Sequence, residues 1–114
     1  MTETDKRHVQ AFTELLENEP LPDSQVVSGA PAVRTAALGA MADVAYGIWE
    51  ITPGVVEDVE ADEVFVVLSG RARVEILDHG TVMDISAGDV VRLFAGERTV
   101  WTVTETLRKV YVAL

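Results

Sequence analysis

The stretch PGVVEDVEADEVFVVLSG, residues 53–70, begins and ends with turn-forming residues and carries a run of apolar residues in its second half. Proline and glycine bound it, and the run EVFVVL, residues 63–68, has the composition of a β-strand. The stretch contains no histidine but five acidic residues, Glu57, Asp58, Glu60, Asp62 and Glu63. It therefore predicts a strand preceded by an acidic loop.

The rest of the chain after residue 45 repeats this strand-and-turn pattern. Short β-rich runs are separated by breaks that mostly contain glycine, namely TPG, SG, DHG, AGD, AGE and TET. Many short strands joined by such turns are typical of an antiparallel sandwich or barrel. The predicted strands cover residues 46–51, 63–68, 71–77, 81–86, 90–94, 99–104 and 108–114.

The N-terminal part has a different pattern. Residues 6–17 predict a short amphipathic helix, because apolar residues recur there at spacings of three and four, namely Val9, Phe12, Leu15 and Leu16. Pro20 and Pro22 end the predicted helix. The polar residues 23–31, which include glycine and proline, predict an extended loop or arm.

Residues 34–47, RTAALGAMADVAYG, are compatible with two structures. The alanines allow a helix, whereas the sequence that follows favours a strand with a loop before it. The predicted organisation is an N-terminal helix and arm at residues 1–32 and a β-domain at residues 33–114.

Composition limits the function. The chain has 114 residues, 48% of them hydrophobic, which is enough for one domain with one core. The net charge of −10 argues against nucleic acid and anionic membranes as partners. The absence of cysteine excludes disulfides, zinc–thiolate sites and thiol nucleophiles. No secretory signal or membrane-length apolar run is evident, so we expect a cytoplasmic protein.

Three segments together resemble the cupin superfamily. The order PG, acidic residues, Glu63 and Gly70 is similar to the first cupin motif. Residues 80–91, GTVMDISAGDVV, resemble the second motif with Ser86 where proline is usual, and residues 93–101, LFAGERTVW, resemble the turn that follows. The resemblance implies an all-β double-stranded β-helix, that is, a jelly-roll barrel.

A finer resemblance lies in residues 28–35, SGAPAVRT, residues 46–54, YGIWEITPG, and the pattern W-x-V-x-E-x-x-R-K-x-Y of residues 101–111. These look like the single-domain cupins related to (S)-ureidoglycine aminohydrolase and to the ethanolamine-utilisation cupin. Since members of this family are commonly dimers, the resemblance also implies a homodimer.

A standard cupin metal site uses three histidines and one glutamate. The two histidines of this chain, His8 and His79, match none of these positions. By resemblance, the histidines of the first motif correspond to Glu57 and Val59, and the histidine of the second motif corresponds to Val91. We therefore expect no tightly bound transition metal.

The matching acidic ligand is Glu63. Together with Glu57 it could hold a divalent ion weakly, because hard cations accept oxygen ligands. A shifted alignment places Glu60 and Asp62 at the histidine positions instead. The alternative is that the acidic residues before Glu63 form a solvated surface, as runs of like charge usually do.

Glu63 and Lys109 are the candidate catalytic residues. By resemblance Glu63 points into the barrel, and Lys109 and Tyr111 share the inward face of the last strand. A lysine and a glutamate in one cavity shift each other's pKa and could transfer protons or bind a polar ligand. The alternative is that Lys109 is exposed or only neutralises Glu63.

The large aromatic residues are candidates for contacts to a ligand, namely Tyr46, Trp49, Phe65, Trp101 and Tyr111. Because strand residues alternate between faces, at most one of Tyr46 and Trp49 lines the same cavity. The alternative for each tryptophan is a place in the core or in a dimer interface. Three arginines that alternate with apolar residues are predicted to face solvent, namely Arg71, Arg73 and Arg92.

Three functions are consistent with these observations. The first is a module that binds a small polar molecule in the barrel without a metal cofactor. The second is a metal-dependent or acid–base enzyme, similar to ureidoglycine aminohydrolase or to an isomerase, that uses Glu63 and Lys109. The third is a structural or assembly role in which the barrel is filled.

Overall fold

The computed structural model describes residues 5–114 and is built almost entirely of β-strands. The elements follow one another as β1 (Glu17–Glu19), a 3₁₀ helix η1 (Asp23–Gln25), β2 (Val26–Ser28), β3 (Val33–Met41), β4 (Val44–Ile51), β5 (Gly54–Val59), β6 (Glu63–Ile76), β7 (Thr81–Ser86), β8 (Val90–Leu93) and β9 (Arg98–Ala113). No helix within this part of the chain is long and apolar enough to cross a membrane.

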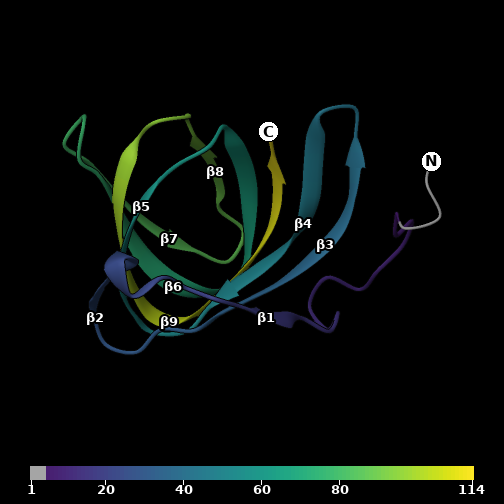
Figure 1. Cartoon of the computed structure of the whole chain (residues 1–114), viewed down its shortest axis with the longest axis horizontal. Helices are drawn as coiled ribbons and strands as arrows, with labels where there is room; N and C mark the ends of the chain where they lie inside the picture. Colours follow the sequence, from purple (N-terminus) through teal and green to yellow (C-terminus); the bar gives the residue numbers. More distant parts are fainter. Residues whose placement is uncertain (1–4) are drawn as a thin grey trace.

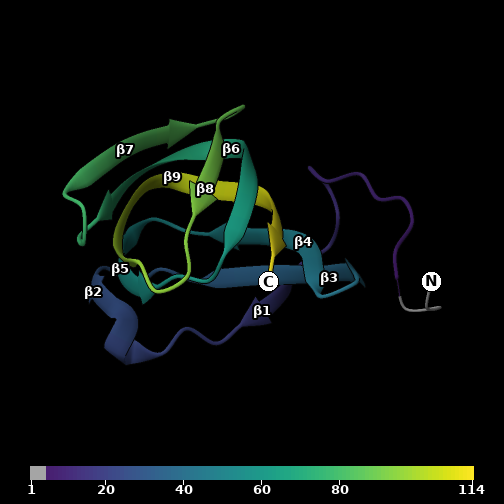
Figure 2. The same ribbon diagram turned by 90° about the horizontal axis from the view of Figure 1, so that it is seen from above.

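The two longest strands, β6 and β9, run antiparallel to each other and form the spine of the molecule. Along its length β9 also pairs with β4 and β5, and β6 also pairs with β7 and β8. The sheet curls on itself (Figure 1). Seen from above, β6, β7 and β8 form one layer, and β3 and β4 belong to the other (Figure 2). The predicted all-β barrel is therefore confirmed.

The inner faces of these strands bury an aliphatic core. Residues alternate between more and less buried along most of β6 and along residues 98–103 of β9, as expected for a sheet with one face toward the core. The fully enclosed members include Phe65, Leu93 and Leu107. Trp49 and Tyr111 are partly buried and pack against this core.

Two predicted strand breaks, SG and TET, do not end a strand. They are irregularities in the pairing of β6 with β9, where the register shifts around Ser69 and Arg71. Gly70 lies at this bend with a φ of 93°, and a Cβ built on it would come within 2.1 Å of the carbonyl oxygen of Thr106. Glycine therefore lets the two strands approach closely while both continue.

The ambiguous residues 34–47 form a β-hairpin. Strands β3 and β4 pair from Val33–Ile51 to Met41–Val44. Ala42 adopts a left-handed conformation with a φ of 54° in the tight turn between them. The alternative of a helix is wrong, because pairing to β9 on one side of β4 and to β1 on the other side of β3 favours the extended form.

The predicted helix at residues 6–17 is also wrong: residues 11–13 form a turn, and β1 begins at Glu17. Isolated helices of this length are marginal. Here the Arg108 side chain donates hydrogen bonds to the backbone carbonyl oxygens of Ala11 and Glu14, at 2.9 and 2.6 Å. Of the predicted apolar face, Phe12 and Leu15 are exposed.

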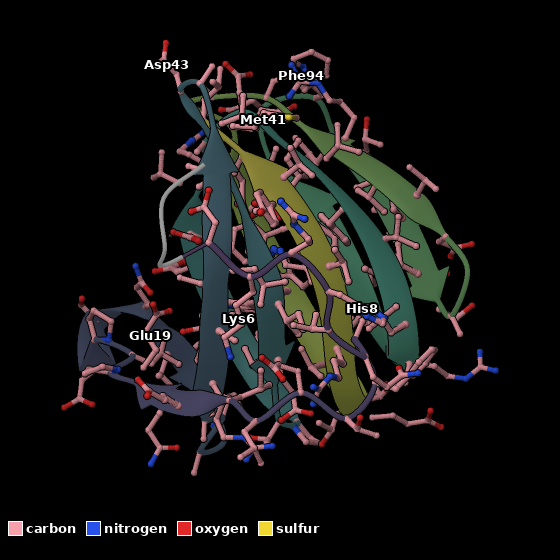
Figure 3. All side chains as sticks on the ribbon, turned by 90° about the vertical axis from the view of Figure 1, so that its right-hand side faces the viewer. Lys6, His8, Glu19, Met41, Asp43 and Phe94 are labelled. Atoms are coloured by element: carbon pink, nitrogen blue, oxygen red, sulfur yellow. The ribbon has the colours of Figure 1, made fainter. Side chains whose placement is uncertain are left out.

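This N-terminal segment, residues 5–16, crosses the outer face of the sheet (Figure 3). The backbone N–H of Lys6 donates to the carbonyl oxygen of Leu38 at 2.7 Å. Leu38 and Ile48 are buried although they do not belong to the core cluster. Side chains alternate along β4, so Ile48 lies on the outer face of the sheet and Ile51 on the inner face. The N-terminal segment therefore covers apolar residues of the outer face.

Candidate functional site

A cavity of about 230 Å³ opens where β4, β5, β6 and β9 meet the segment that follows β1. Its walls combine aromatic rings with a few charged groups, as is usual for a small-molecule site. The residues that matter below are Trp49, Glu60, Glu63, Trp101, Lys109 and Tyr111. The segment from Glu19 to Pro22, between the end of β1 and η1, closes one side.

Lys109 and Glu63 meet inside the barrel. Their strands, β9 and β6, are neighbours, and Lys109 pairs in register with Val67. The Lys109 Nζ lies 2.7 Å from Glu63 Oε2, with side chains only 7% and 12% exposed. Of the two alternatives for Lys109, exposure is wrong, and neutralisation of Glu63 agrees with this geometry.

Three aromatic rings complete the environment of this ammonium. The Lys109 Nζ lies 4.1 Å from the ring centre of Phe65, 4.5 Å from that of Trp49 and 5.1 Å from that of Trp101. A carboxylate and aromatic ring faces are groups that an amino group of lysine contacts favourably. Lys109 Nζ therefore lies in a cage of one carboxylate and three aromatic rings.

Glu60 is a second, partly buried carboxylate of the cavity. Its Oε2 accepts hydrogen bonds from Thr99 Oγ1 at 2.6 Å and from Trp101 Nε1 at 3.2 Å. Its backbone is joined on both sides to the turn after β8, through Glu97 and Gly96. Burial raises the pKa of Glu60, and the two side-chain hydrogen bonds lower it by less.

The predicted acidic loop is wrong for Glu57 and Asp58, which lie in strand β5, but the predicted solvated acidic surface holds for these two residues. Glu57 and Asp58 are exposed at the rim of the cavity, where partial desolvation raises the pKa of Asp58. Asp62 accepts hydrogen bonds from the backbone N–H of Ala95 and from Arg92, which lower its pKa. The prediction is wrong for Glu60, because the chain turns inward once β5 ends at Val59.

Tyr111 lines the cavity beside Lys109. Its strand partner is Gly47, and a Cβ on that glycine would lie 2.6 Å from the Tyr111 hydroxyl oxygen. The missing side chain therefore leaves room for the tyrosine ring against β4. Burial raises the pKa of the Tyr111 hydroxyl.

The other predicted residues lie in different places. Tyr46 is outside the cavity, on the outer face of β4, with its hydroxyl 3.5 Å from the carbonyl oxygen of Lys6. Phe65 is buried behind the cavity in contact with Lys109 and Trp101. Trp49 and Trp101 both reach the cavity. The three arginines predicted to face solvent are exposed and pair with acidic side chains, namely Arg71, Arg73 and Arg92.

Sequence reasoning missed the inward position of Glu60 and the roles of Thr99 and the segment after β1. From the sequence, Glu60 was considered only as one of the acidic residues before Glu63 or as a metal ligand in a shifted alignment. Nothing in the spacing of these residues marks their association, because Glu60 and Thr99 are 39 positions apart. The pairing of β5 with β9 brings them together.

The donor set gives little support for a metal site. Residues 5–114 contain no group of three or more histidine, cysteine, aspartate or glutamate side chains that could hold a metal ion. His79 lies on the hairpin turn with its Nε2 3.2 Å from a carboxylate oxygen of Glu97. His8 lies on the N-terminal segment (Figure 3).

Several solved protein structures are similar to this one. A protein of unknown function of the DUF861 family from Pseudomonas syringae pv. tomato superposes with a TM-score of 0.78 and 25% identity. The alignment covers 89% of this chain and 45% of that chain, so this chain spans less than half of that protein's length. No protein with a curated description matches.

Two shorter proteins are also similar. A putative ethanolamine utilization protein, EutQ, from Salmonella typhimurium LT2 has 26% identity and a TM-score of 0.61 over 72% of this chain and 68% of that chain. A DUF861 family protein from Thermotoga maritima has 31% identity and a TM-score of 0.55 over 59% of this chain and 76% of that chain. The family model described as the EutQ-like cupin domain matches residues 38–111. The chain therefore belongs to the EutQ-like cupin domain family.

Proposed function

We propose that this cupin domain binds a small polar molecule in the barrel cavity and does so without a tightly bound transition metal. The observation that carries the proposal is the cavity of about 230 Å³ walled by Trp49, Trp101 and Tyr111, into which the polar groups of Glu60, Glu63 and Lys109 converge. Small-molecule sites typically combine apolar walls with a few convergent polar groups.

The charges favour one class of ligand. Four glutamates and one aspartate border the cavity, namely Glu19, Glu57, Asp58, Glu60 and Glu63, whereas Lys109 is its one cationic side chain among the described residues. A negatively charged ligand would meet this excess of negative charge. We expect a neutral or positively charged molecule that carries N–H or O–H donors.

The unused acceptors of the cavity agree with such a ligand. Lys109 contacts Oε2 of Glu63, and within residues 5–114 no hydrogen bond reaches Oε1. The same holds for Oε1 of Glu60, since Thr99 and Trp101 both donate to Oε2. Each free oxygen offers a place for a donor of the ligand.

A thermal-shift screen tests this proposal. The panel contains small amines, amides, ureas and polyols, with carboxylic acids and sugar phosphates of similar size as the negatively charged comparison. A ligand that binds the folded state raises the melting temperature. We expect stabilisation by a member of the first group, weakened in Trp49→Ala and retained in the surface variant Arg73→Met. Stabilisation only by anions would contradict the proposed class.

A second candidate is an acid–base enzyme, a hydrolase or isomerase that uses Glu63 and Lys109. The observation that favours it is the presence of two carboxylates, Glu63 and Glu60, in one cavity with different environments, the first paired and the second with a raised pKa. Such differences are common at catalytic sites. For any reaction found, Glu63→Gln and Lys109→Met should abolish turnover, whereas Arg73→Met should not.

A structural or assembly role is the third candidate and requires a filled barrel. The open cavity favours ligand binding over this role. The homodimer expected from the family resemblance stays a prediction, to be measured by size-exclusion chromatography with light scattering.

A further inference from the structure

We draw a further inference from Lys109, the cationic side chain inside the barrel. The cupin resemblance implies a metal ion held by three histidines and the acid at Glu63. In this chain the corresponding positions do not converge: Val91 is 5% exposed within the core, whereas Val59 is 65% exposed. Valine offers no ligand atom, so the residues present do not fit the metal.

Glu63, the matching acid, is already engaged. Its Oε2 lies 2.7 Å from the Lys109 ammonium, which Phe65, Trp49 and Trp101 surround on the other sides. A buried carboxylate needs a neighbouring positive charge to remain ionised. Lys109 supplies that charge from the chain itself.

We propose that the Lys109 ammonium takes the place of a metal ion as the fixed cation of this barrel. It balances Glu63, holds one carboxylate oxygen and leaves the other oriented for a ligand. This inference builds on the proposed function, because it names the cation within the same cavity.

Replacing a metal ion by the Lys109 ammonium changes how a ligand is bound. An ammonium donates hydrogen bonds but has no open coordination position for a lone pair of the ligand or of water. Recognition therefore depends on the glutamate oxygens, which accept hydrogen bonds, and on the aromatic walls. This agrees with a ligand that carries donors.

Chemical rescue tests the inference. Lys109→Ala removes the cation and leaves space for a small amine. We expect the variant to have a lower melting temperature, which n-propylammonium restores by several degrees and the similarly sized neutral 1-propanol does not. Lys6→Ala removes the chain's other lysine from an exposed pair with Glu14 and should show no rescue. Equal effects of the amine and the alcohol on Lys109→Ala would overturn the inference.

A second variant keeps the inference testable if Lys109→Ala does not fold. Lys109→Met combined with Glu63→Gln removes both charges and keeps the volumes similar. We expect this double variant to melt at a higher temperature than Lys109→Met alone, because no unpaired carboxylate remains. A double variant that is no more stable than Lys109→Met would contradict the pairing on which the inference rests.

Metal analysis gives an independent readout. Wild-type protein purified without a His tag or metal column, incubated with Mn²⁺ or Zn²⁺ and then desalted, should retain only substoichiometric metal. Stoichiometric metal that is lost in Glu63→Gln would overturn the inference. Failure of the ligand screen alone would count against the proposed function and leave these results unaffected.

Discussion

The carboxylate of Glu63 and the ammonium of Lys109 meet at 2.7 Å inside the barrel although 46 positions separate them in the chain. Glu63 begins β6, and Lys109 lies near the end of β9, so the antiparallel pairing of the two longest strands places them on the same inward face. The pair connects the fold to the proposed binding site, because the strands that form the spine also position the charges.

Removing one partner of this pair should be strongly destabilising. Lys109→Met leaves Glu63 buried without its counter-charge, and breaking a buried pair typically costs about 3 kcal/mol of unfolding free energy. Urea unfolding followed by tryptophan fluorescence measures the loss, since both tryptophans contact this site. Arg73→Met, which breaks an exposed pair with Asp84, is the control and should change stability by less than about 1 kcal/mol. Equal losses in the two variants would contradict the buried pair.

Glu60 should make stability depend on pH. Burial raises the pKa of Glu60 in the folded state. Between the ordinary and the raised pKa the folded state holds a proton that the unfolded state has released, so stability falls as pH rises through this window and stays lower above it. Glu60→Gln keeps an acceptor for Thr99 and Trp101 without the charge. We expect it to be more stable than wild type at neutral pH, with the advantage shrinking toward acidic pH.

The control for Glu60 is Glu105→Gln, which removes the same charge from an exposed position 64% accessible to solvent. Urea unfolding at several pH values compares the three proteins. Asp58, whose pKa is also raised, contributes a slope of the same sign in all of them. If Glu60→Gln and wild type keep a constant difference at every pH, Glu60 does not titrate as the structure indicates.

Gly70 should tolerate no side chain. Gly70→Ala combines an unfavourable φ of 93° with a contact of 2.1 Å to the carbonyl oxygen of Thr106. We expect a loss of about 3 kcal/mol or more in unfolding free energy. Gly80→Ala is the matched control, with a φ of 65° but open space around the new methyl group. Its cost should be about 1 kcal/mol, and a similar cost at Gly70 would show that the strands can separate there.

Arg108 should hold the N-terminal segment on the sheet. Its guanidinium is buried and donates to the carbonyl oxygens of Ala11 and Glu14, with Glu50 as its acidic partner at 3.6 Å. Arg108→Met should release residues 5–16, seen as faster hydrogen exchange and proteolysis of this segment with slower exchange retained in β6. Arg98→Met, which breaks an exposed pair with Asp78, should leave the segment protected. Protection unchanged in Arg108→Met would show that other contacts suffice.

The sequence predicted the β-rich domain and most strand positions correctly, because alternation and turn residues act locally. It predicted two breaks, SG and TET, where the strands continue across a bend. A glycine next to a serine has the same composition at a turn and at a bulge, and only the partner strand distinguishes them. It also predicted a helix at residues 6–17 that tertiary contacts with Arg108 replace.

Of the candidate site, resemblance and alternation together predicted that Glu63, Lys109 and Tyr111 face inward. The structure brings Trp49 and Trp101 to the same cavity and leaves Tyr46 outside. Glu60 could not be assigned, because its burial depends on where the loop after β5 lies against the turn after β8.

The sequence by itself determined the class of fold and the loss of the histidine ligands, since both depend on residue type and on periodicity along one segment. Only the tertiary structure decided which acid is buried, which cation balances it and which aromatic rings surround that cation. These are contacts between β4, β5, β6 and β9. Burial and charge pairing depend on distances across the barrel, and the spacing of residues along a single strand carries no information about them.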